Sequence, residues 1–575
     1  MLALNQPVLP PLLPNRRYCN QTYKGFYIHG TSVFFVFGIQ YPGSVHWSKL
    51  YKCVSCGEYF VSKSGADLHM CPIIVFRFHP EIPGYCESHT FALLHLLRFI
   101  SFYNISFKSA QDNELSESYK ELDPTFEIPK KTKLKELMIS FANHIKATHL
   151  RELTNKTVSL MVDGCKRWGK NYLAVIIFTH SRLYMYSVLS PPNEAAVTLA
   201  QQIAGVIEDL ESNRITVISV NTDNAANNKK ALNNDDDSAQ ALSNSHFIRQ
   251  PCAAHTLNLV IEDTFGNENA PYHYILLDIQ FLLRHPPRGS CRDGFEHKLM
   301  TIRWISLFDC VNFIYTHLNE YYHSEVKEVQ GALKQVEDSV GWNCLHAVLL
   351  IFREFLSCIE QDLCSIADLI PPYIHAAEQL SVLVGELPQH AFYNLGNRFT
   401  STCPLFLPWA AFFLTSQGLM FFRNAQYQQN YLFRMSRSAL EHYMKERGFL
   451  QYTVQCNLQA YEKYLQNFPL TVFERAPSAF DMWRIPFSFI PRSFRILAQE
   501  ILQIPCTETA CERLFSALSA TTQPRMSSIL PATVDARLTV KFDSIFKRAG
   551  SVSIDDLGND PRKTLKLHKY PIFGL

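Results

Sequence analysis

The chain has 575 residues, of which 47% are hydrophobic and 13% aromatic, and its formal net charge is only +2. This length exceeds one ordinary core, so we expect two to four structural units. The composition excludes a largely disordered protein, and the near-neutral charge excludes a globally basic nucleic-acid binder, so any DNA affinity must come from local basic faces. The 16 cysteines are scattered through segments typical of buried helices and strands, which indicates reduced thiols in an intracellular protein.

A cysteine and histidine cluster stands at residues 51–72, after a β-prone stretch. Its potential metal ligands are Cys53, Cys56, His69 and Cys71. Two residues separate Cys53 from Cys56, and twelve separate Cys56 from His69, which is the spacing of a zinc finger. Phe60 stands at the position where a finger buries an aromatic side chain. The last two ligands are only one residue apart, closer than in a standard finger. His79 is therefore an alternative fourth ligand, and a decayed finger with free thiols is an alternative to a zinc site.

A polar and charged segment follows, and a helix is predicted from residue 133 to about 150. Three lysines, Lys130, Lys131 and Lys133, form a short basic cluster at the start of this helix. Such a cluster can contact phosphate or serve as a nuclear signal, and a solvated helix start is the structural alternative.

The next hundred residues alternate between strand and helix patterns. Short apolar runs rich in β-branched residues predict strands at 157–162, 172–178, 183–188 and 215–220. A helix with an apolar stripe is predicted after Asn193. Asp163 follows the first strand and Asp223 the fourth. If these strands are neighbours, the two carboxylates can share a divalent ion at the ends of the strands, although aspartates are also common turn residues.

From residue 251 to 490 the patterns are mostly helical. Within this part, 404–422 contains no charged residue and is nearly long enough to span a bilayer, but its prolines and polar residues favour a buried helix. Cys252 and His255 have the spacing of half a zinc site; with no second pair nearby, a packed thiol and a histidine bonded to the backbone are favoured. Three more helices are predicted at 494–504, 509–518 and 534–545.

Several short motifs, in order along the chain, resemble those of hAT-family DNA transposases. They are Asp223-Asn224-Ala225-Ala226-Asn227, Cys252 through Leu259, Arg303-Trp304-Ile305-Ser306, Trp409 through Phe422, Ile504-Pro505, Glu512-Arg513-Leu514-Phe515-Ser516 and Arg525 through Ala536. The resemblance runs from about Lys131 to Asp543. It implies an α/β fold with an RNase H-like mixed sheet interrupted by a large all-α insertion domain, preceded here by a small zinc-finger-like region.

The resemblance also implies an activity, which is metal-dependent DNA cleavage and strand transfer. It places the three catalytic carboxylates on Asp163, Asp223 and Glu512, which would hold Mg²⁺ or Mn²⁺. Without the resemblance, Glu512 is an ordinary surface glutamate. Arg303 and Trp304 are implied to belong to a pocket for a base flipped out of the DNA end, with a core tryptophan as the alternative.

The chain departs from the family pattern just after the first carboxylate. Cys165 stands where the family usually has a stacking tryptophan, and Trp168 is a candidate substitute that would lie in the turn. Asn228 and Cys511 are further departures that leave the metal ligands intact. The retained carboxylates favour the transposase, whereas the missing aromatic favours a domesticated, catalytically inactive, dimeric DNA-binding protein of the transcription-regulator kind.

The patterns and the resemblance together predict six segments. They are an N-terminal region (1–110), a linker with a helical DNA-binding or dimer region (111–150), the first part of the RNase H-like core (151–265), a helical insertion (266–490), the C-terminal dimerisation region with the last part of the core (491–548) and a tail (549–575). We expect DNA and a second copy of the chain as partners, Zn²⁺ in the finger, no membrane association, and a location in the nucleus.

Overall fold

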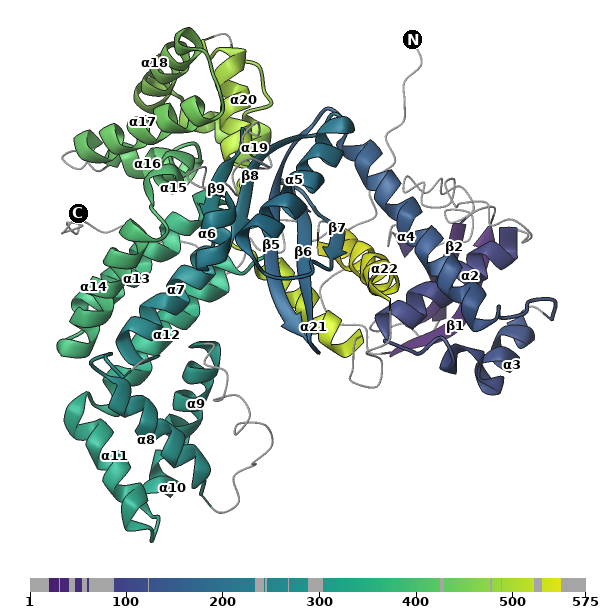
Figure 1. The fold of residues 1–575 in the computed structure, drawn as a ribbon, viewed down its shortest axis with the longest axis horizontal. Coiled ribbons are helices and arrows are strands. Elements are labelled where there is room, and N and C mark those ends of the chain that lie inside the picture. Colours follow the sequence, from purple (N-terminus) through teal and green to yellow (C-terminus); the bar gives the residue numbers. More distant parts are fainter. Residues whose placement is uncertain are drawn as a thin grey trace. The chain divides into compact units, whose positions relative to one another are not determined.

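The computed structural model describes most of the chain between residues 87 and 549, together with four earlier strands (Figure 1). The described residues are 20–29, 32–40, 47–53, 59–60, 87–122, 124–232, 242, 246–266, 268–287, 304–424, 429–475, 478–487, 489–521 and 530–549. The chain divides into two compact units, Met1–Leu96 and Leu97–Leu575, and each is treated by itself below.

The first unit contains an antiparallel four-stranded sheet. Its strands, in spatial order, are β1 (Asn20–His29), β2 (Ser32–Gln40), β3 (Trp47–Cys53) and β4 (Tyr59–Phe60). Cys53 is the last residue of β3. The other predicted zinc ligands, Cys56, His69, Cys71 and the alternative His79, lie outside the described residues. The zinc site therefore stays a prediction.

The second unit contains a mixed five-stranded sheet, which confirms the predicted α/β class. The strands are β5 (Thr157–Arg167), β6 (Lys170–Phe178), β7 (Leu183–Leu189), β8 (Thr216–Thr222) and β9 (Ile248–Pro251). Their order is β7-β6-β5-β8-β9, and only β6 runs opposite to the rest. The fifth strand, β9, was not predicted, because its four residues Ile-Arg-Gln-Pro carry no apolar alternation.

Strand β5 is longer than the sequence pattern indicated. We expected it to end at residue 162, but Asp163 to Arg167 continue to pair with β6. The two strands are joined by a two-residue turn, Trp168-Gly169, in which both residues have positive φ, 50° and 75°. This backbone matches the twist of a tight hairpin, and glycine adopts it at little cost. Asp163 therefore lies inside the strand rather than after it, whereas Trp168 lies in the turn as predicted.

The two faces of the sheet carry different helices. Leu160 and Val162 point into a core shared with α5 (Ala196–Ser212). Met161, between them, points into a second core with α21 (Thr509–Thr521) and α22 (Pro531–Ala549). Alternate residues of a strand face opposite sides, so this placement fixes the side on which every β5 side chain lies.

The remaining elements of the second unit are helical, which confirms the mostly helical pattern of residues 251–490, while the helix at Asn113–Leu122 lies in the segment that we expected to be a polar linker. Before and within the sheet they are α3 (Asn113–Leu122), α4 (Lys131–Leu153) and α6 (Ala226–Leu232). After the sheet they are α7 (Ala253–Ile261), α8 (His273–Arg284), α9 (Trp304–Thr316), α10 (Leu318–Tyr322), α11 (Lys327–Ser339), α12 (Trp342–Ile359), α13 (Ile370–Val382), α14 (Glu386–Ser401), α15 (Phe406–Phe412), α16 (Ser416–Asn424), α17 (Gln429–Glu446), α18 (Gln451–Asn467), α19 (Ala479–Met482) and α20 (Arg492–Ile501). Helix α2 (Glu87–Phe102) precedes them all.

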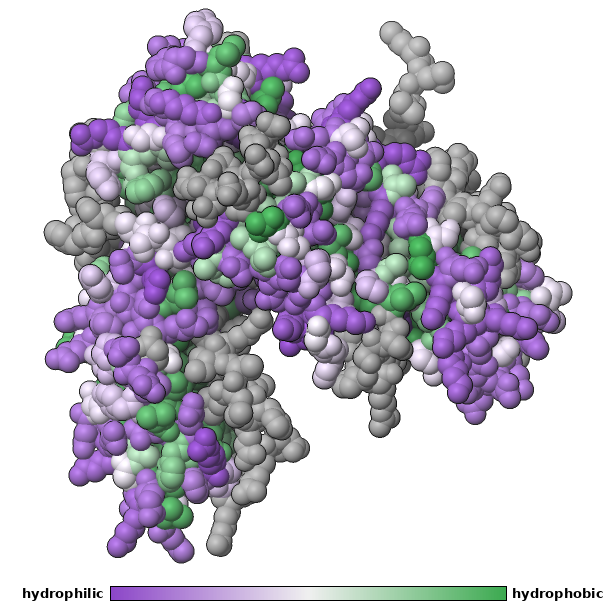
Figure 2. Space-filling model, viewed as in Figure 1, coloured by the Kyte–Doolittle hydropathy of each residue, from purple (hydrophilic) through white to green (hydrophobic). Residues whose placement is uncertain are grey.

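The apolar segment 404–422 forms two short helices, α15 and α16, rather than the single buried helix that we expected. They meet closely at Gly418, where an added Cβ would lie 1.9 Å from the carbonyl oxygen of Phe412. Among the described residues, α12 is the helix long and apolar enough to cross a membrane, and its Leu345, Phe352 and Leu356 are buried in the helical core. Figure 2 shows a face covered mostly by hydrophilic residues, with hydrophobic residues in smaller patches.

Candidate functional site

Asp163 lies on the β5 face that meets α21. It is two residues after Met161, whose carbonyl oxygen accepts a hydrogen bond from the Cys511 thiol at 3.5 Å. Residues i and i+2 of a strand share a face, so Asp163 and Cys165 both lie on the α21 side. The Asp163 carboxylate accepts a hydrogen bond from the amide of Gly164 at 2.7 Å.

Asp223 follows the neighbouring parallel strand, β8. Met161 is paired with Asn221 across the two strands, so Asp163 and Asp223 stand at the same end of the sheet. The first and fourth predicted strands are thus neighbours, which is the condition under which we expected the two aspartates to lie close together. Asp223 Oδ1 accepts hydrogen bonds from the Ala225 amide at 2.9 Å and from Asn228 Nδ2 at 2.5 Å. This carboxylate oxygen therefore helps to fix the start of α6.

Glu512 is brought to this region by the segment that precedes α21. The carbonyl oxygen of Pro505 accepts a hydrogen bond from Asn221 Nδ2 at 3.1 Å, and that of Cys506 accepts one from the Ala253 amide at 2.8 Å. On its other side the segment forms an antiparallel bridge, Ser365 with Pro505. These bonds hold the segment against β8, α7 and the helical insertion. Glu512 then falls in the first turn of α21, where a negative charge is favourable.

A further acidic residue, Glu508, lies beside these carboxylates and was missed by sequence reasoning. It is 2% exposed, and its Oε2 has no hydrogen-bond partner among the described residues. Burial raises the pKa of Glu508 well above its usual range, and the charges of Asp163 and Glu512 raise it further. Its spacing of four residues from Glu512 was the available signal, because such residues are neighbours on a helix.

The donor chemistry suits a hard divalent cation, since carboxylate oxygens are its preferred ligands. Within the described ranges, however, no three or more His, Cys, Asp or Glu side chains are gathered closely enough to hold a metal ion. Asp163, Asp223 and Glu512 lie on neighbouring elements at one end of the sheet, but they do not form such a group, and Asp223 is bonded to residues at the start of α6.

The cysteines near the site act as packed groups. The Cys252 thiol caps α7 by accepting a hydrogen bond from the His255 amide at 3.4 Å, which supports the favoured structural role over half a zinc site. Burial is the main cause that raises the pKa of Cys165 to about 12. That thiol therefore stays protonated at neutral pH.

The predicted DNA contacts lie at scattered places. Trp168 is 53% exposed at the tip of the β5–β6 hairpin. Lys130, Lys131 and Lys133 are exposed at the start of α4, where Lys133 also pairs with Glu136 at 3.4 Å. Arg303 lies outside the described residues, and Trp304 opens α9 but the position of its side chain is not described.

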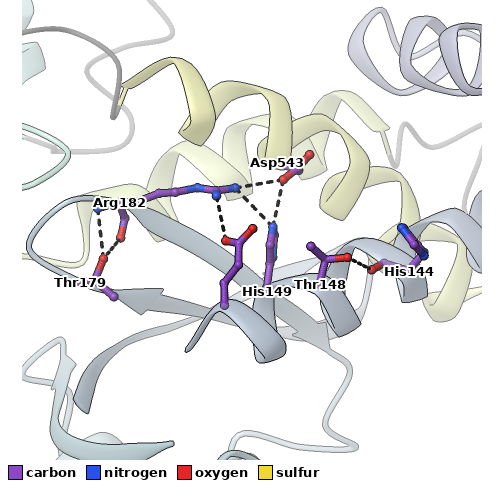
Figure 3. A network of polar contacts seen from close by, with 7 residues as sticks. His144, Thr148, His149, Thr179, Arg182 and Asp543 are labelled. Carbon is purple, nitrogen blue, oxygen red and sulfur yellow. Dashed lines mark hydrogen bonds and ion pairs between the residues drawn. The ribbon is translucent and has the colours of Figure 1, made fainter. Parts of the chain in front are cut away.

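A separate polar network joins α4, α22 and the turn between β6 and β7 (Figure 3). Asp543 of α22 accepts hydrogen bonds from His149 Nε2 of α4 at 3.0 Å and from Arg182, in the β6–β7 turn, at 3.2 Å. Arg182 also bonds Glu152 at 3.2 Å. Asp535, two turns earlier on α22, accepts from the Val188 amide at 2.7 Å and pairs with Lys146 at 2.6 Å. These carboxylates fix α22 on α4 and β7.

Comparison with known families assigns this C-terminal part. Residues 460–544 match the model of the hAT family C-terminal dimerisation region. The chain carries a hAT family dimerisation region. The match confirms the resemblance to the hAT family that the sequence motifs indicated, and it supports a transposase-like protein that self-associates. No curated protein matches the chain.

The hAT region runs from the second half of α18 to α22. It therefore contains Glu508, Glu512, Asp535 and Asp543. The part of the chain that matches the family thus supplies both the candidate third carboxylate and the contacts that fix α22.

Proposed function

We propose that the protein is a hAT-like DNA transposase that cleaves DNA and transfers strands with Mg²⁺ or Mn²⁺, and that it forms a dimer through its C-terminal region. The observation that carries the proposal is the placement of three carboxylates. Asp163, inside β5, and Asp223, just after the adjacent parallel strand β8, stand where the parallel pairing of the two strands ends, and α21, with Glu512 in its first turn, packs on β5. The RNase H-like arrangement that the resemblance implies is supported by the mixed sheet, the long helical part that follows it, and the helices α21 and α22 that pack back on the sheet.

Asp163, Asp223 and Glu512 would hold the cation. A bound divalent cation would neutralise charge on the phosphodiester and activate the attacking hydroxyl. In cleavage, water would attack phosphorus and the DNA 3′-oxygen would leave. In strand transfer, a 3′-hydroxyl would attack a phosphorus of the target strand, and the 3′-oxygen of that strand would leave. The chain contributes mainly by positioning these groups. Before cation binding, Asp223 has to exchange its bonds to Ala225 and Asn228 for the metal.

DNA contacts are proposed for the β5–β6 hairpin and for the start of α4. The hairpin presents Trp168 beside the exposed side chains of Lys166 and Arg167. An exposed aromatic with neighbouring cations suits stacking on a base and contact with phosphate. The Lys130, Lys131 and Lys133 cluster suits phosphate contact at α4. Zn²⁺ in the N-terminal motif, base holding by Arg303 and Trp304, and a nuclear location belong to the same proposal.

The test is nicking of supercoiled plasmid in Mn²⁺ by the full-length protein. Asp163→Asn and Glu512→Gln should each abolish nicking, whereas Glu211→Gln, an exposed change on α5, should leave it unchanged. Nicking that persists in both carboxylate variants would overturn the proposed site.

The second candidate function is a domesticated, inactive, dimeric DNA-binding protein. It is favoured by the engagement of Asp223 with α6 and by Cys165 in place of a stacking aromatic. Absence of nicking in folded protein that binds DNA and sediments as a dimer would establish this function instead.

A further inference from the structure

Two buried cysteines, Cys364 and Cys506, face each other where the segment before α21 meets the chain after α12. Ser365 and Pro505 form an antiparallel bridge between these two segments. Beside the bridge, the Cys506 amide donates a hydrogen bond to the Cys364 carbonyl oxygen at 3.2 Å. In antiparallel pairing, one step back along one segment corresponds to one step forward along the other, so Cys364 lies directly opposite Cys506.

The two thiols converge on the C-terminal end of α12. Cys364 Sγ lies 3.6 Å from the carbonyl oxygen of Cys358, and Cys506 Sγ lies 3.7 Å from that of Ile359. These carbonyl groups belong to consecutive residues, and the two thiols also hydrogen-bond each other. The sulfur atoms are therefore neighbours, and both cysteines are free in the structure.

The backbone at this place suits a disulfide. Directly opposite residues of an antiparallel pair have Cα atoms about 4.5–5.5 Å apart, and a disulfide requires about 4.4–6.8 Å. The side chains of such a pair also lie on the same face. A bond between Cys364 and Cys506 therefore requires rotation of the side chains rather than movement of the backbone.

In the reduced protein the pair is a packed dithiol. Cys506 is fully buried, whereas Cys364 is 8% exposed. The hydrogen bond with Cys506, ahead of burial, raises the pKa of the Cys364 thiol well above its usual range, and burial raises the pKa of Cys506. Because the thiolate is the reactive form, the dithiol is the resting state at neutral pH, and oxidation requires an oxidant small enough to reach Cys364.

We propose that Cys364 and Cys506 form a redox site, which a peroxide converts to a disulfide. The Cys364 thiolate attacks one peroxide oxygen and the O–O bond breaks, which gives a sulfenic acid and a hydroxide that takes up the proton released by the thiol. The Cys506 thiolate then attacks the Cys364 sulfur, the S–S bond forms, and a second hydroxide leaves and takes up the other thiol proton. Two thiols and one hydrogen peroxide thus give one disulfide and two waters.

The disulfide ties the segment that leads into α21 to the chain that leaves α12. It closes a long loop that contains α13 to α20, so it also removes many conformations from the unfolded chain. In the oxidised protein, α21 stays attached to the helical part of the chain. The inference is independent of the proposed cation site and of DNA cleavage.

The experiment treats the full-length protein with hydrogen peroxide, blocks the remaining thiols after unfolding, and maps disulfides by tandem mass spectrometry of an unreduced digest. We expect a peptide pair in which Cys364 is joined to Cys506, and reduction should remove it. Cys506→Ala should abolish this pair. Cys310→Ala, at another fully buried cysteine, should keep it. Oxidation of the exposed Cys358 shows that the oxidant has acted.

Thermal unfolding and hydrogen exchange test what the bond does. The oxidised wild type should melt about 3 °C or more above the reduced protein, and a reducing agent should reverse this shift. Exchange of the Cys506 amide, which donates to Cys364, should slow in the oxidised protein. Cys506→Ala should show no rise in melting temperature on oxidation.

The results that overturn the inference are specific. One is oxidation of Cys358 without any link between Cys364 and Cys506. Another is a disulfide from Cys506 to a different neighbouring cysteine, Cys252 or Cys403. A link that forms but leaves both the melting temperature and the exchange rate unchanged overturns the claim that the bond ties α21 to the chain after α12.

Discussion

Replacing Asp543 by asparagine should destabilise the protein strongly, because it removes the buried counter-charge of Arg182 and leaves this arginine only the more exposed Glu152. Asp543 is 2% exposed and lies 3.2 Å from Arg182 and 3.0 Å from His149. Breaking a buried ion pair from one side costs about 3–5 kcal/mol. Asparagine keeps the shape and one acceptor oxygen, so we expect a loss of about 3 kcal/mol in the free energy of unfolding, measured by urea denaturation.

The same arginine provides the control. Glu152 bonds Arg182 at a similar distance, 3.2 Å, but its side chain is 43% exposed, so Glu152→Gln should cost less than about 1 kcal/mol. Adding Arg182→Met to Asp543→Asn should recover part of the loss, because the largely buried arginine charge that has lost its buried partner is then gone. Equal costs for the two single changes, or a loss below about 0.5 kcal/mol for Asp543→Asn, would refute the assignment of this network as buried and charged.

Three further predictions concern other parts of the chain. Gly418→Ala should lower stability by about 2–3 kcal/mol, because its Cβ would meet backbone atoms, whereas Gly396→Ala, with nothing within 4 Å, should be neutral or stabilising; a thermal melt decides. Burial lowers the pKa of His180, which is stacked on Phe480, to about 4. The neutral ring therefore contributes fully to the free energy of unfolding above about pH 6.5, and this contribution is lost as the pH falls toward 4. After allowance for its partly exposed ring, wild type should lose on the order of 1 kcal/mol more than His180→Phe between pH 7 and 5 in urea titrations, and equal losses would contradict this. Trp168→Asn, which tolerates the positive φ, should weaken DNA binding by about 1–3 kcal/mol in fluorescence titrations without changing stability, and an unchanged affinity would remove the hairpin from the DNA interface.

Four of the five strands, β5 to β8, could be predicted because each contains an apolar run with β-branched residues, which is a local signal in the sequence. The end of β5 could not, because residues 163–167 are polar and glycine-containing and are extended only by pairing with β6. For the same reason β9 escaped prediction: four residues without alternation become a strand through the parallel register with β8. In both segments, pairing with a neighbouring strand rather than the local sequence makes the backbone extended.

The residues of the candidate site also differ in how far the sequence alone could predict their positions. The placement of Asp163 beside Asp223 followed from strand order, which the sequence pattern allowed but did not require. Glu512 was found by resemblance, because two hundred and more helical residues separate it from the sheet in the sequence. Glu508 was not found at all, since its burial depends on contacts with α7 and β8 that no local pattern contains.

The C-terminal hAT region has a role inside the chain as well as in self-association. Its α21 carries Glu508 and Glu512 against β5, and its α22 is held on β7 and α4 by Asp535 and Asp543. Because α21 and α22 share one apolar core with the sheet, a change that releases α22 also loosens the turn that positions Glu512. A loss of DNA cleavage in an α22 variant would therefore not by itself show that dimerisation is required. Only a change on an exposed position of the region, with the Asp543 network intact, separates self-association from the placement of the carboxylates.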